Sequence, residues 1–207
     1  MHCQESLTLE KDGRMPSRYT FTDYSPDWPA AFEREAERLR PLLGEEVVAV
    51  HHIGSTSVPG LAAKPIIDLL PVVRDIAAID DHTPRLRDTG YRAWGEYGLP
   101  GRRYFTRDHG EFRTHNLHVY QFDNPCVERH LAFCAYLRHH ERPRREYEAL
   151  KRAVYARHPA DIEAYNDGKD AWIKRVEPLA LEWYRRQALA RGSPAGPTRV
   201  GCPPPDT

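Results

Sequence analysis

The sequence predicts an α+β fold, because strand-like segments come first along the chain and helix-like segments come last. The chain has 207 residues, of which 40% are hydrophobic, so it is long enough for one good core. We expect one domain at 18–191, with a sheet-containing core at 18–125 and a helical part at 126–191. The polar segment 1–17 and the Pro- and Gly-rich segment 192–207 are expected to be disordered tails.

The first elements are a helix and two strands separated by a loop. Pro26–Leu43 predicts a helix, because apolar residues recur at helical spacing with acids between them. Val47–Ile53 is an apolar, β-branched run, which is typical of a strand. Gly54–Lys64 is small and polar, so we expect a loop with a short helix after Ser57. Pro65–Val73 is apolar on both faces, which indicates a buried central strand.

The remaining elements follow from glycine and proline positions. The turn-rich run Gly98–Gly101 between two strand-like segments predicts a hairpin, and prolines interrupt the long helical stretch near the end. In chain order we expect a helix at Ile76–Thr89, a hairpin of Tyr91–Tyr97 and Arg102–Arg107, a strand at Asn116–Phe122, and helices from Val127 to about Arg191 broken near Pro143 and Pro159.

The overall charge excludes several kinds of partner. Lys and Arg together number 30 and balance 30 acids, so no global field points to nucleic acid or an anionic membrane. No stretch approaches the roughly 18 apolar residues that span a bilayer, and the start of the chain lacks a signal-peptide core. We therefore expect a cytoplasmic protein, a monomer or homodimer. The four cysteines lack CxxC spacing, so free thiols are expected.

The most informative segment joins the first two strands. Gly54 follows a strand end, and Ser55, Thr56 and Ser57 then offer hydroxyls beside backbone N–H groups. If a short helix begins near Val58, its positive end points at the same place, and such a loop can hold a phosphate or carboxylate group. A plain turn with an N-cap is the alternative.

Asp68 is the second informative residue. It lies among Ile66, Ile67, Leu69 and Leu70, in a strand that should be covered on both faces. An uncompensated carboxylate there would cost several kcal/mol, by the scale for buried charge. It therefore needs a partner, which is either a metal ion at a functional site or a salt bridge to Lys64 or an arginine.

These residues carry a resemblance to a known family. The run HIGSTSVPGLAAKPIIDLLPVV, which starts at His52, resembles the signature of the GrpB family, a branch of the polymerase-beta nucleotidyltransferase superfamily. The likeness extends from roughly Tyr24 to Arg186. Further matching positions are Tyr24 with Trp28, the run from His115 to Val119, Phe133 with Tyr136 to Arg138, Tyr147 to Lys151, and Tyr165 with Lys169.

The resemblance implies a fold and an activity. It implies a mixed β-sheet with helices on one side and a C-terminal helical segment. It also implies that Gly54 and Ser55 grip a nucleoside triphosphate, expected to be ATP, while Asp68 binds a divalent metal. Mg²⁺ or Mn²⁺ suits this chemistry, since hard cations bridge oxygen ligands to phosphates and stabilise the transferring group.

The sequence departs from the usual pattern of active members. A second acid is expected two residues after Asp68, but Leu70 occupies that position, and the later strand offers His118 instead of a third carboxylate. Two alternatives remain open: His118 and His52 join Asp68 as ligands of zinc or iron, or one histidine acts as a general base. Glu96 is a candidate replacement acid and metal ligand. Each histidine is equally consistent with a packing role.

The helical part offers candidate phosphate contacts. Only five of the 30 basic residues are lysines, and Lys151 and Lys169 each follow a tyrosine by one helical turn, Tyr147 and Tyr165 respectively. The resemblance implies that such helices wall the nucleotide pocket, with the lysines on phosphate and the tyrosines near the base; snorkelling lysines on a packed face are the alternative. The other candidate anion contacts are Lys64, Arg102, Arg103 and Arg138.

Two functions are therefore expected from the sequence. The first is an enzyme that transfers a nucleotidyl group from a nucleoside triphosphate to a small-molecule acceptor, or activates a carboxylate as an adenylate. The second is a nucleotide- or partner-binding accessory module that has lost acids, as Leu70 suggests. Nucleic acid is not expected as the acceptor, because no basic stripe is present.

Overall fold

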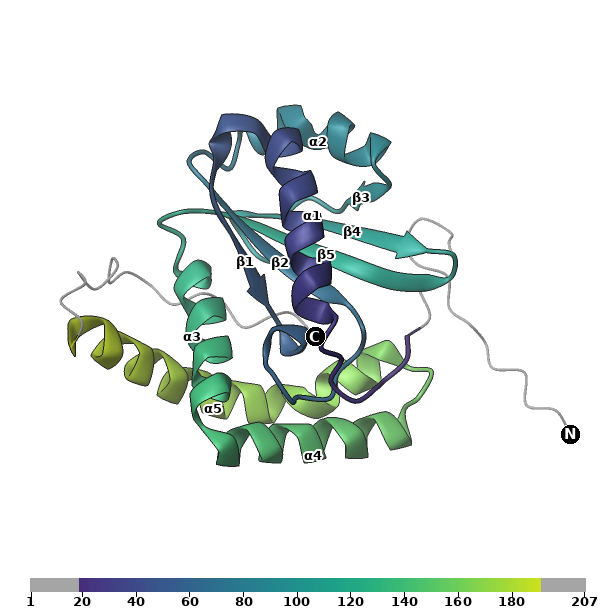
Figure 1. Cartoon of the computed structure of the whole chain (residues 1–207), viewed down its shortest axis with the longest axis vertical. Coiled ribbons are helices and arrows are strands. Elements are labelled where there is room, and N and C mark those ends of the chain that lie inside the picture. The colour runs from purple at the N-terminus through teal and green to yellow at the C-terminus, as the bar shows by residue number, and fades with distance from the viewer. Residues whose placement is uncertain (1–18, 191–207) are drawn as a thin grey trace, which may run out of the picture.

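The structure is a computed structural model and describes residues 19–190 (Figure 1). The two expected tails therefore lie outside the described residues. Five strands form one mixed sheet in the order β1-β2-β5-β4-β3, in which β2 and β5 are parallel and the other neighbours are antiparallel. The strands are β1 (Val47–Ile53), β2 (Ile67–Val73), β3 (Tyr91–Ala93), β4 (Arg102–His109) and β5 (Phe112–Gln121).

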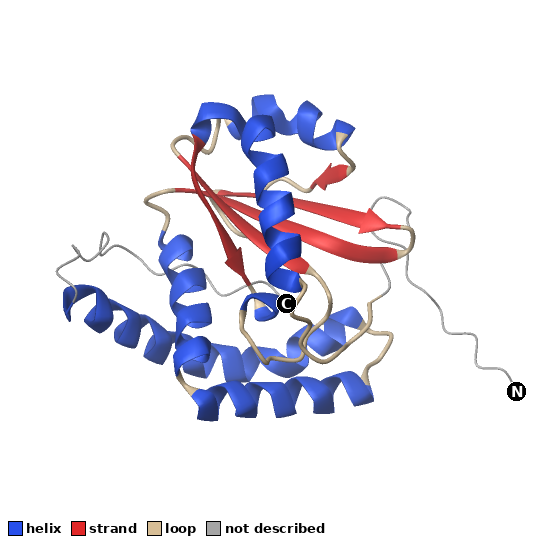
Figure 2. Cartoon of the chain, viewed as in Figure 1, coloured by secondary structure: helices blue, strands red, loops and turns tan. Residues whose placement is uncertain are grey.

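Helices cover the sheet unequally. The helices are α1 (Trp28–Leu43), α2 (Ile79–Asp88), α3 (Pro125–His139), α4 (Glu141–Arg157) and α5 (Ile162–Ala190). Helices α1 and α2 pack on one face, where Leu69 and Leu117 join the larger apolar cluster. Helix α3 packs on the other face, over Leu70 and Tyr120. The α+β class and the mixed sheet are confirmed, and α3 adds cover on the face that the resemblance left open (Figure 2).

Helices α4 and α5 lie beyond one end of the sheet and pack against each other and α3 (Figure 1). A third apolar cluster joins them to the loop before β2, because Val58 and Leu61 contact the rings of Tyr147 and Trp172. The loop after β1 therefore lies at the junction between the sheet and the helical part. None of the helices in residues 19–190 is long and apolar enough to span a bilayer.

Several expected boundaries shift for identifiable reasons. Strand β5 begins at Phe112 rather than Asn116, because it forms a hairpin with β4 whose turn falls at Gly110. The break near Pro143 is confirmed between α3 and α4, and Pro143 itself lies in the first turn of α4, where proline is tolerated because its missing N–H has no partner to lose. The break near Pro159 is confirmed between α4 and α5.

The expected short helix near Val58 is absent. Ser55–Ser57 instead forms one turn of 3₁₀ helix, and Val58 is extended. The loop therefore offers its own backbone N–H groups, without the dipole of a longer helix. Among the cysteines of residues 19–190, Cys134 is a free buried thiol as expected, but Cys126 is disulfide-bonded, against the expectation of free thiols.

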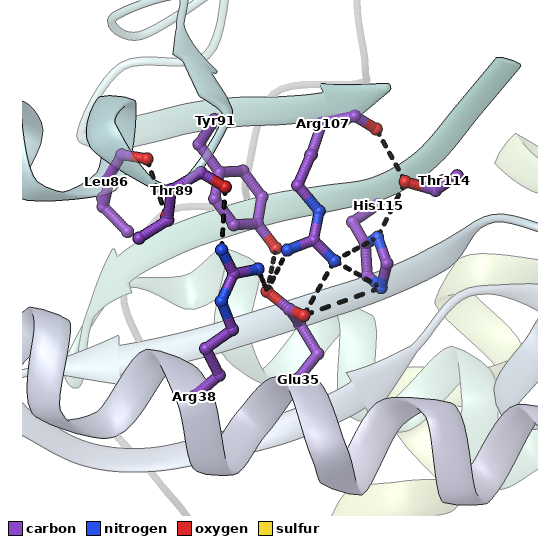
Figure 3. Close-up of polar contacts among 8 residues, drawn as sticks. All are labelled: Glu35, Arg38, Leu86, Thr89, Tyr91, Arg107, Thr114 and His115. Atoms are coloured by element: carbon purple, nitrogen blue, oxygen red, sulfur yellow. Dashed lines mark hydrogen bonds and ion pairs between the residues drawn. The ribbon is translucent and has the colours of Figure 1, made fainter. Parts of the chain in front are cut away.

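A buried ion-pair network ties α1 to the sheet. Glu35 of α1 is only 6% exposed, and Arg107 of β4 binds it with two nitrogens at 3.0 and 2.8 Å (Figure 3). The Tyr91 hydroxyl donates to the same carboxylate at 2.8 Å, and Arg38 donates at 3.3 Å. His115 contacts Arg107 from the neighbouring strand. Every Glu35 oxygen is therefore satisfied, as a buried carboxylate requires.

Candidate functional site

The loop after β1 is held by its own side chains. Thr56 donates to the carbonyl oxygen of Ile66 at 3.1 Å, and Ser57 donates to the carbonyl oxygen of Gly54 at 2.8 Å. Both hydroxyls are therefore used inside the loop, and both residues are buried. Arg138 of α3 donates to the carbonyl oxygens of Ser57 and His52, at 3.0 and 3.4 Å. This geometry assigns these side chains to shaping the turn.

Gly54 is the point where the loop meets Asp68. Its φ of 68° lies in the left-handed region, which glycine adopts at low cost. A Cβ at this position would lie 2.2 Å from Asp68 Oδ2, a distance that forbids any side chain. The sequence therefore needs glycine here for two reasons, the backbone conformation and the close approach of the carboxylate.

Asp68 lies near the start of β2, between Ile53 of β1 and Asn116 of β5. Asn116 donates its amide to Asp68 Oδ1 at 2.7 Å, and His118 Nε2 lies 3.8 Å from the same oxygen. The other oxygen, Oδ2, faces Gly54. No lysine or arginine in residues 19–190 lies within ion-pair distance of Asp68, so neither salt bridge considered from the sequence forms.

The electrostatics of Asp68 favour its charged form. Burial raises its pKa, but the imidazole of His118, the amide of Asn116 and the charge of Lys64 together lower the pKa below its usual value. The side chain is 24% exposed, so part of it reaches solvent. The result is an ionised carboxylate with one oxygen turned toward the glycine turn.

Asn116 and Tyr104 are site residues that sequence reasoning missed. The Tyr104 hydroxyl of β4 donates to Asn116 Oδ1 at 3.1 Å, which directs the amide nitrogen of Asn116 toward Asp68. Asn116 could have been predicted from the sequence, because residues two apart on a strand point to the same face, and Asn116 precedes the candidate His118 by two residues. Nothing local marks Tyr104, since its place depends on β4–β5 pairing.

The two candidate histidines lie on opposite faces of the sheet. His118 shares the face of Asp68 and lies beneath α3, with its ring 5.5 Å from that of His130. His52 instead stacks on Phe32 of α1 at 4.7 Å and contacts the Thr56 hydroxyl at 3.0 Å. Burial lowers the pKa of both imidazoles, to about 4 for His52, so both are neutral at neutral pH.

The expected three-ligand metal site is therefore not assembled. His118 lies beside Asp68, but His52 lies on the other face, and no group of three His, Cys, Asp or Glu side chains in the described part of the chain is placed to hold a metal. Glu96 lies in the β3–β4 hairpin, where it accepts from the backbone of Gly101 at 2.7 Å. Asp68 is the carboxylate that faces the loop.

Three of the five lysines lie near one another, and two of them, Lys64 and Lys169, also lie near Asp68. Lys64 and Lys169 both lie over the ring of Tyr165, at 5.0 and 4.1 Å, and Lys151 lies 4.8 Å from the ring of Tyr147. We call Lys64, Lys151 and Lys169 the lysine cluster. Its members form no ion pair with a carboxylate of residues 19–190. Lys151 donates to the carbonyl oxygen of Ala62 at 2.5 Å.

Burial lowers the pKa of each lysine in the cluster, and repulsion by neighbouring lysines lowers it further at Lys151 and Lys169. The pKa of Lys64 falls to about 8 and that of Lys151 to about 7, chiefly through burial, and that of Lys169 lies well below its ordinary value. The nearby Asp68 opposes this change at Lys64 and Lys169. Unpaired cations held this close together favour an added anion.

The other candidates have different surroundings. Tyr147 and Tyr165 are 5% and 1% exposed, so their rings support the lysine cluster from within the core. Arg103 binds Asp80 of α2 at 2.7 and 2.8 Å, on the opposite face from Asp68. Arg102 is buried and donates to hairpin carbonyls, including that of Glu96 at 3.1 Å.

Comparison with known proteins identifies the family. The model of the family described as "GrpB protein" matches residues 18–178. The chain is 46% identical over 170 residues to UPF0157 protein YqkA of Bacillus subtilis, covering 82% of this chain and 49% of YqkA. The chain belongs to the GrpB family.

A GrpB structure confirms the fold of this family member. The crystal structure of conserved protein GrpB from Enterococcus faecalis aligns with a TM-score of 0.76 and 45% identity, covering 79% of this chain and 98% of that one. A dephospho-CoA kinase of Mycolicibacterium paratuberculosis is 28% identical over 204 residues, covering 86% of this chain and 49% of the kinase. This chain therefore spans about half the length of both YqkA and the kinase.

Leu70 shows why the second acid is missing from this GrpB domain. Its side chain is fully buried with Ile53 and Cys134, in the cluster beneath α3. A carboxylate there would be surrounded by apolar groups, at a cost of several kcal/mol. Helix α3 thus makes an apolar residue the stable choice two positions after Asp68.

Proposed function

We propose that this GrpB domain binds a nucleoside triphosphate with a divalent metal and transfers the nucleotidyl group to a small-molecule acceptor, or activates a carboxylate as an adenylate. ATP with Mg²⁺ or Mn²⁺ is the expected pair. The observation that carries the proposal is the contact between Gly54 and Asp68 Oδ2, an oxygen that accepts no hydrogen bond from residues 19–190, near three lysines without carboxylate partners in the same residues. The family resemblance to polymerase-beta-type nucleotidyltransferases agrees with this arrangement.

In this proposal the Gly54–Ser55 turn and the partly exposed Lys64 and Lys169 bind the phosphates, while the buried Lys151 adds positive charge nearby. The turn presents backbone N–H groups at a place where no side chain blocks approach, and the cluster offsets phosphate charge. Asp68 Oδ2 would hold the metal together with phosphate oxygens and water, because hard cations favour oxygen ligands. Bound there, the metal would neutralise charge that develops on the transferring phosphoryl group.

His118 has a positioning role in this proposal. Its Nε2 lies 3.8 Å from Asp68 Oδ1, and Asn116 donates to the same oxygen, so both groups hold Oδ1 and leave Oδ2 without a hydrogen bond from residues 19–190. His52 packs on the other face of the sheet against α1, and its contact with Thr56 supports the loop. His52 therefore contributes to stability of the turn and does not take part in the chemistry.

A second candidate is a nucleotide-binding accessory module without catalysis. Two observations favour it: Leu70 occupies the position of the second acid, and a dephospho-CoA kinase contains a segment similar to this chain. One carboxylate binds Mg²⁺ weakly unless phosphate oxygens complete the coordination. In the module, nucleotide binding depends on the turn and the lysines but not on metal.

Thermal melting separates the two candidates. The chain is melted with ATP, CTP, GTP or UTP, with and without Mg²⁺ or Mn²⁺, since a ligand of the native state raises the melting temperature by mass action. If the chain is the proposed enzyme, nucleotide with metal should raise the melting temperature. Asp68→Asn should remove this increase, and the exposed control Asp123→Asn should retain it. An increase that ignores metal and Asp68 supports the module. No increase with any nucleotide contradicts both.

A further inference from the structure

The hairpin between β3 and β4 extends the Asp68 network across the sheet. We call Trp94, Tyr97 and Tyr104 the aromatic cluster. Tyr104 reaches Asp68 through Asn116. Tyr97 stacks on Tyr104 with centroids 5.2 Å apart and an interplanar angle of 23°, and Trp94 lies 5.4 Å from Tyr97. A continuous row of rings therefore leads from the carboxylate to the surface of the hairpin.

Tyr97 is exceptional in both conformation and exposure. Its φ of 44° makes it the one non-glycine residue in the described range 19–190 with a positive φ. A bulky side chain in this region is strained by about 1–2 kcal/mol, and such strain clusters at functional sites. The side chain is 59% exposed, so one face of its ring is open for a further stacked group.

Two arginines set the charge of this surface. Arg102 lies 4.7 Å from the ring of Tyr104 and 5.9 Å from that of Tyr97, and Arg92 lies 3.8 Å from the ring of Trp94. These guanidinium groups disfavour a cationic ligand and favour a planar group with available π electrons. A ring that bears no positive charge fits this surface best.

The sheet order separates this surface from the phosphate site. The Gly54 turn follows β1, Asp68 lies on β2, and Tyr104 lies on β4, two strand spacings or about 10 Å from β2. The lysine cluster lies by α4 and α5. In phosphoryl transfer the attacking and leaving oxygens lie roughly in line. If the leaving diphosphate lies at the turn and lysines, the attacking group approaches from the side of the hairpin.

We infer that the aromatic cluster binds the acceptor, and that this acceptor carries an uncharged planar ring that stacks on Tyr97. The inference rests on the proposed function and adds the chemical class of the second substrate. An acceptor hydroxyl, amine or carboxylate attached to the ring would then extend past Tyr104 toward Asp68.

The test uses two probes with the same carbon skeleton, one aromatic and planar and the other saturated. Binding of 2-naphthylmethanol and of its saturated decahydro analogue is measured by saturation-transfer NMR on the full chain. The variants are Tyr97→Gly, which removes both ring and backbone strain and so should fold at least as well, and Tyr97→Phe, which keeps the ring. Phe122→Ala is the matched control, because Phe122 is also 59% exposed but lies after β5.

We expect the planar probe to bind the unaltered chain and Tyr97→Phe, and to bind Tyr97→Gly roughly threefold to tenfold more weakly. Phe122→Ala should match the unaltered chain, and the ATP-dependent melting shift should survive in Tyr97→Gly. Equal binding of the saturated analogue, or equal loss in Phe122→Ala, overturns the inference alone. Ring binding without any nucleotide-dependent shift in the unaltered chain removes both the proposed function and the acceptor assignment.

Discussion

Glu35 and Asp68 are two sheltered carboxylates on opposite faces of one sheet, and their surroundings differ. Glu35 accepts from Arg107, Arg38 and Tyr91 (Figure 3), so both of its oxygens are satisfied. Asp68 accepts one hydrogen bond from residues 19–190, from Asn116, and its Oδ2 lies against Gly54. The lysines beside Asp68 approach without pairing with it.

The difference separates a structural acid from a candidate functional one. Glu35 joins α1 to β4 with all its hydrogen-bonding capacity used inside the protein, which leaves nothing for a ligand. Asp68 is ionised, partly exposed and close to lysines that have no carboxylate partner in residues 19–190. A bound metal ion or anionic ligand would therefore supply the contacts that the protein does not. Burial alone does not distinguish the two acids, but the hydrogen-bond and ion-pair donors to each carboxylate do.

The largest expected effect breaks the Glu35 network. Replacing Glu35 by Gln leaves Arg107 partly buried beside a neutral group, so the free energy of unfolding should fall by about 3–5 kcal/mol. Asp68→Asn should cost about 1 kcal/mol or less, because one hydrogen bond is at stake. Urea denaturation measures both. Equal losses in the two variants would erase the distinction between the acids.

A smaller effect tests the contact between Gly54 and Asp68. Gly54→Ala should lower the free energy of unfolding by about 2–4 kcal/mol, because it combines a left-handed backbone with overpacking against the carboxylate. In an Asp68→Ala background the same change should cost at most half as much. A double-mutant cycle by urea denaturation measures this coupling. Additive costs would show that the two residues do not meet.

A separate effect is a pH dependence of the lysine cluster. The folded pKa values of Lys64 and Lys151, about 8 and about 7, lie below the ordinary value of 10.5. At pH values between the folded and the ordinary pKa, the unfolded chain therefore binds more protons than the folded chain. Stability should therefore rise as the pH increases from about 7 toward 10.5, the direction required by linkage. Lys151→Met should flatten this rise, measured by urea denaturation at several pH values.

Anion binding should change in the opposite direction over the same range. As Lys151 and Lys64 lose protons above about 7 and about 8, the affinity for sulfate should fall, because sulfate keeps its charge while the lysines lose theirs. Isothermal titration calorimetry measures this loss. Lys174→Met is the control, since Lys174 pairs with Asp170 at 2.8 Å on the exposed side of α5. Affinity that stays constant with pH would argue against the cluster as an anion site.

The sequence predicts the elements of this fold better than the partners of its side chains. The strand before Gly54 and the buried strand around Asp68 could be predicted, because apolar runs and a glycine at a strand end are patterns of neighbouring residues in the sequence. The opposite placement of His52 and His118 was not, since it depends on the register between β1 and β2. The Glu35 network was also missed, because Glu35 and Arg107 are far apart in the sequence and meet through tertiary packing.

The most direct measurement is a crystal structure of the full chain with a non-hydrolysable ATP analogue and Mn²⁺, using anomalous scattering to locate the metal. The account predicts a Mn²⁺ peak about 2 Å from Asp68 Oδ2, with phosphates between the Gly54 turn and the lysine cluster. Phosphates bound elsewhere, or an Asp68 carboxylate that pairs with Lys64 and contacts no metal, would contradict it.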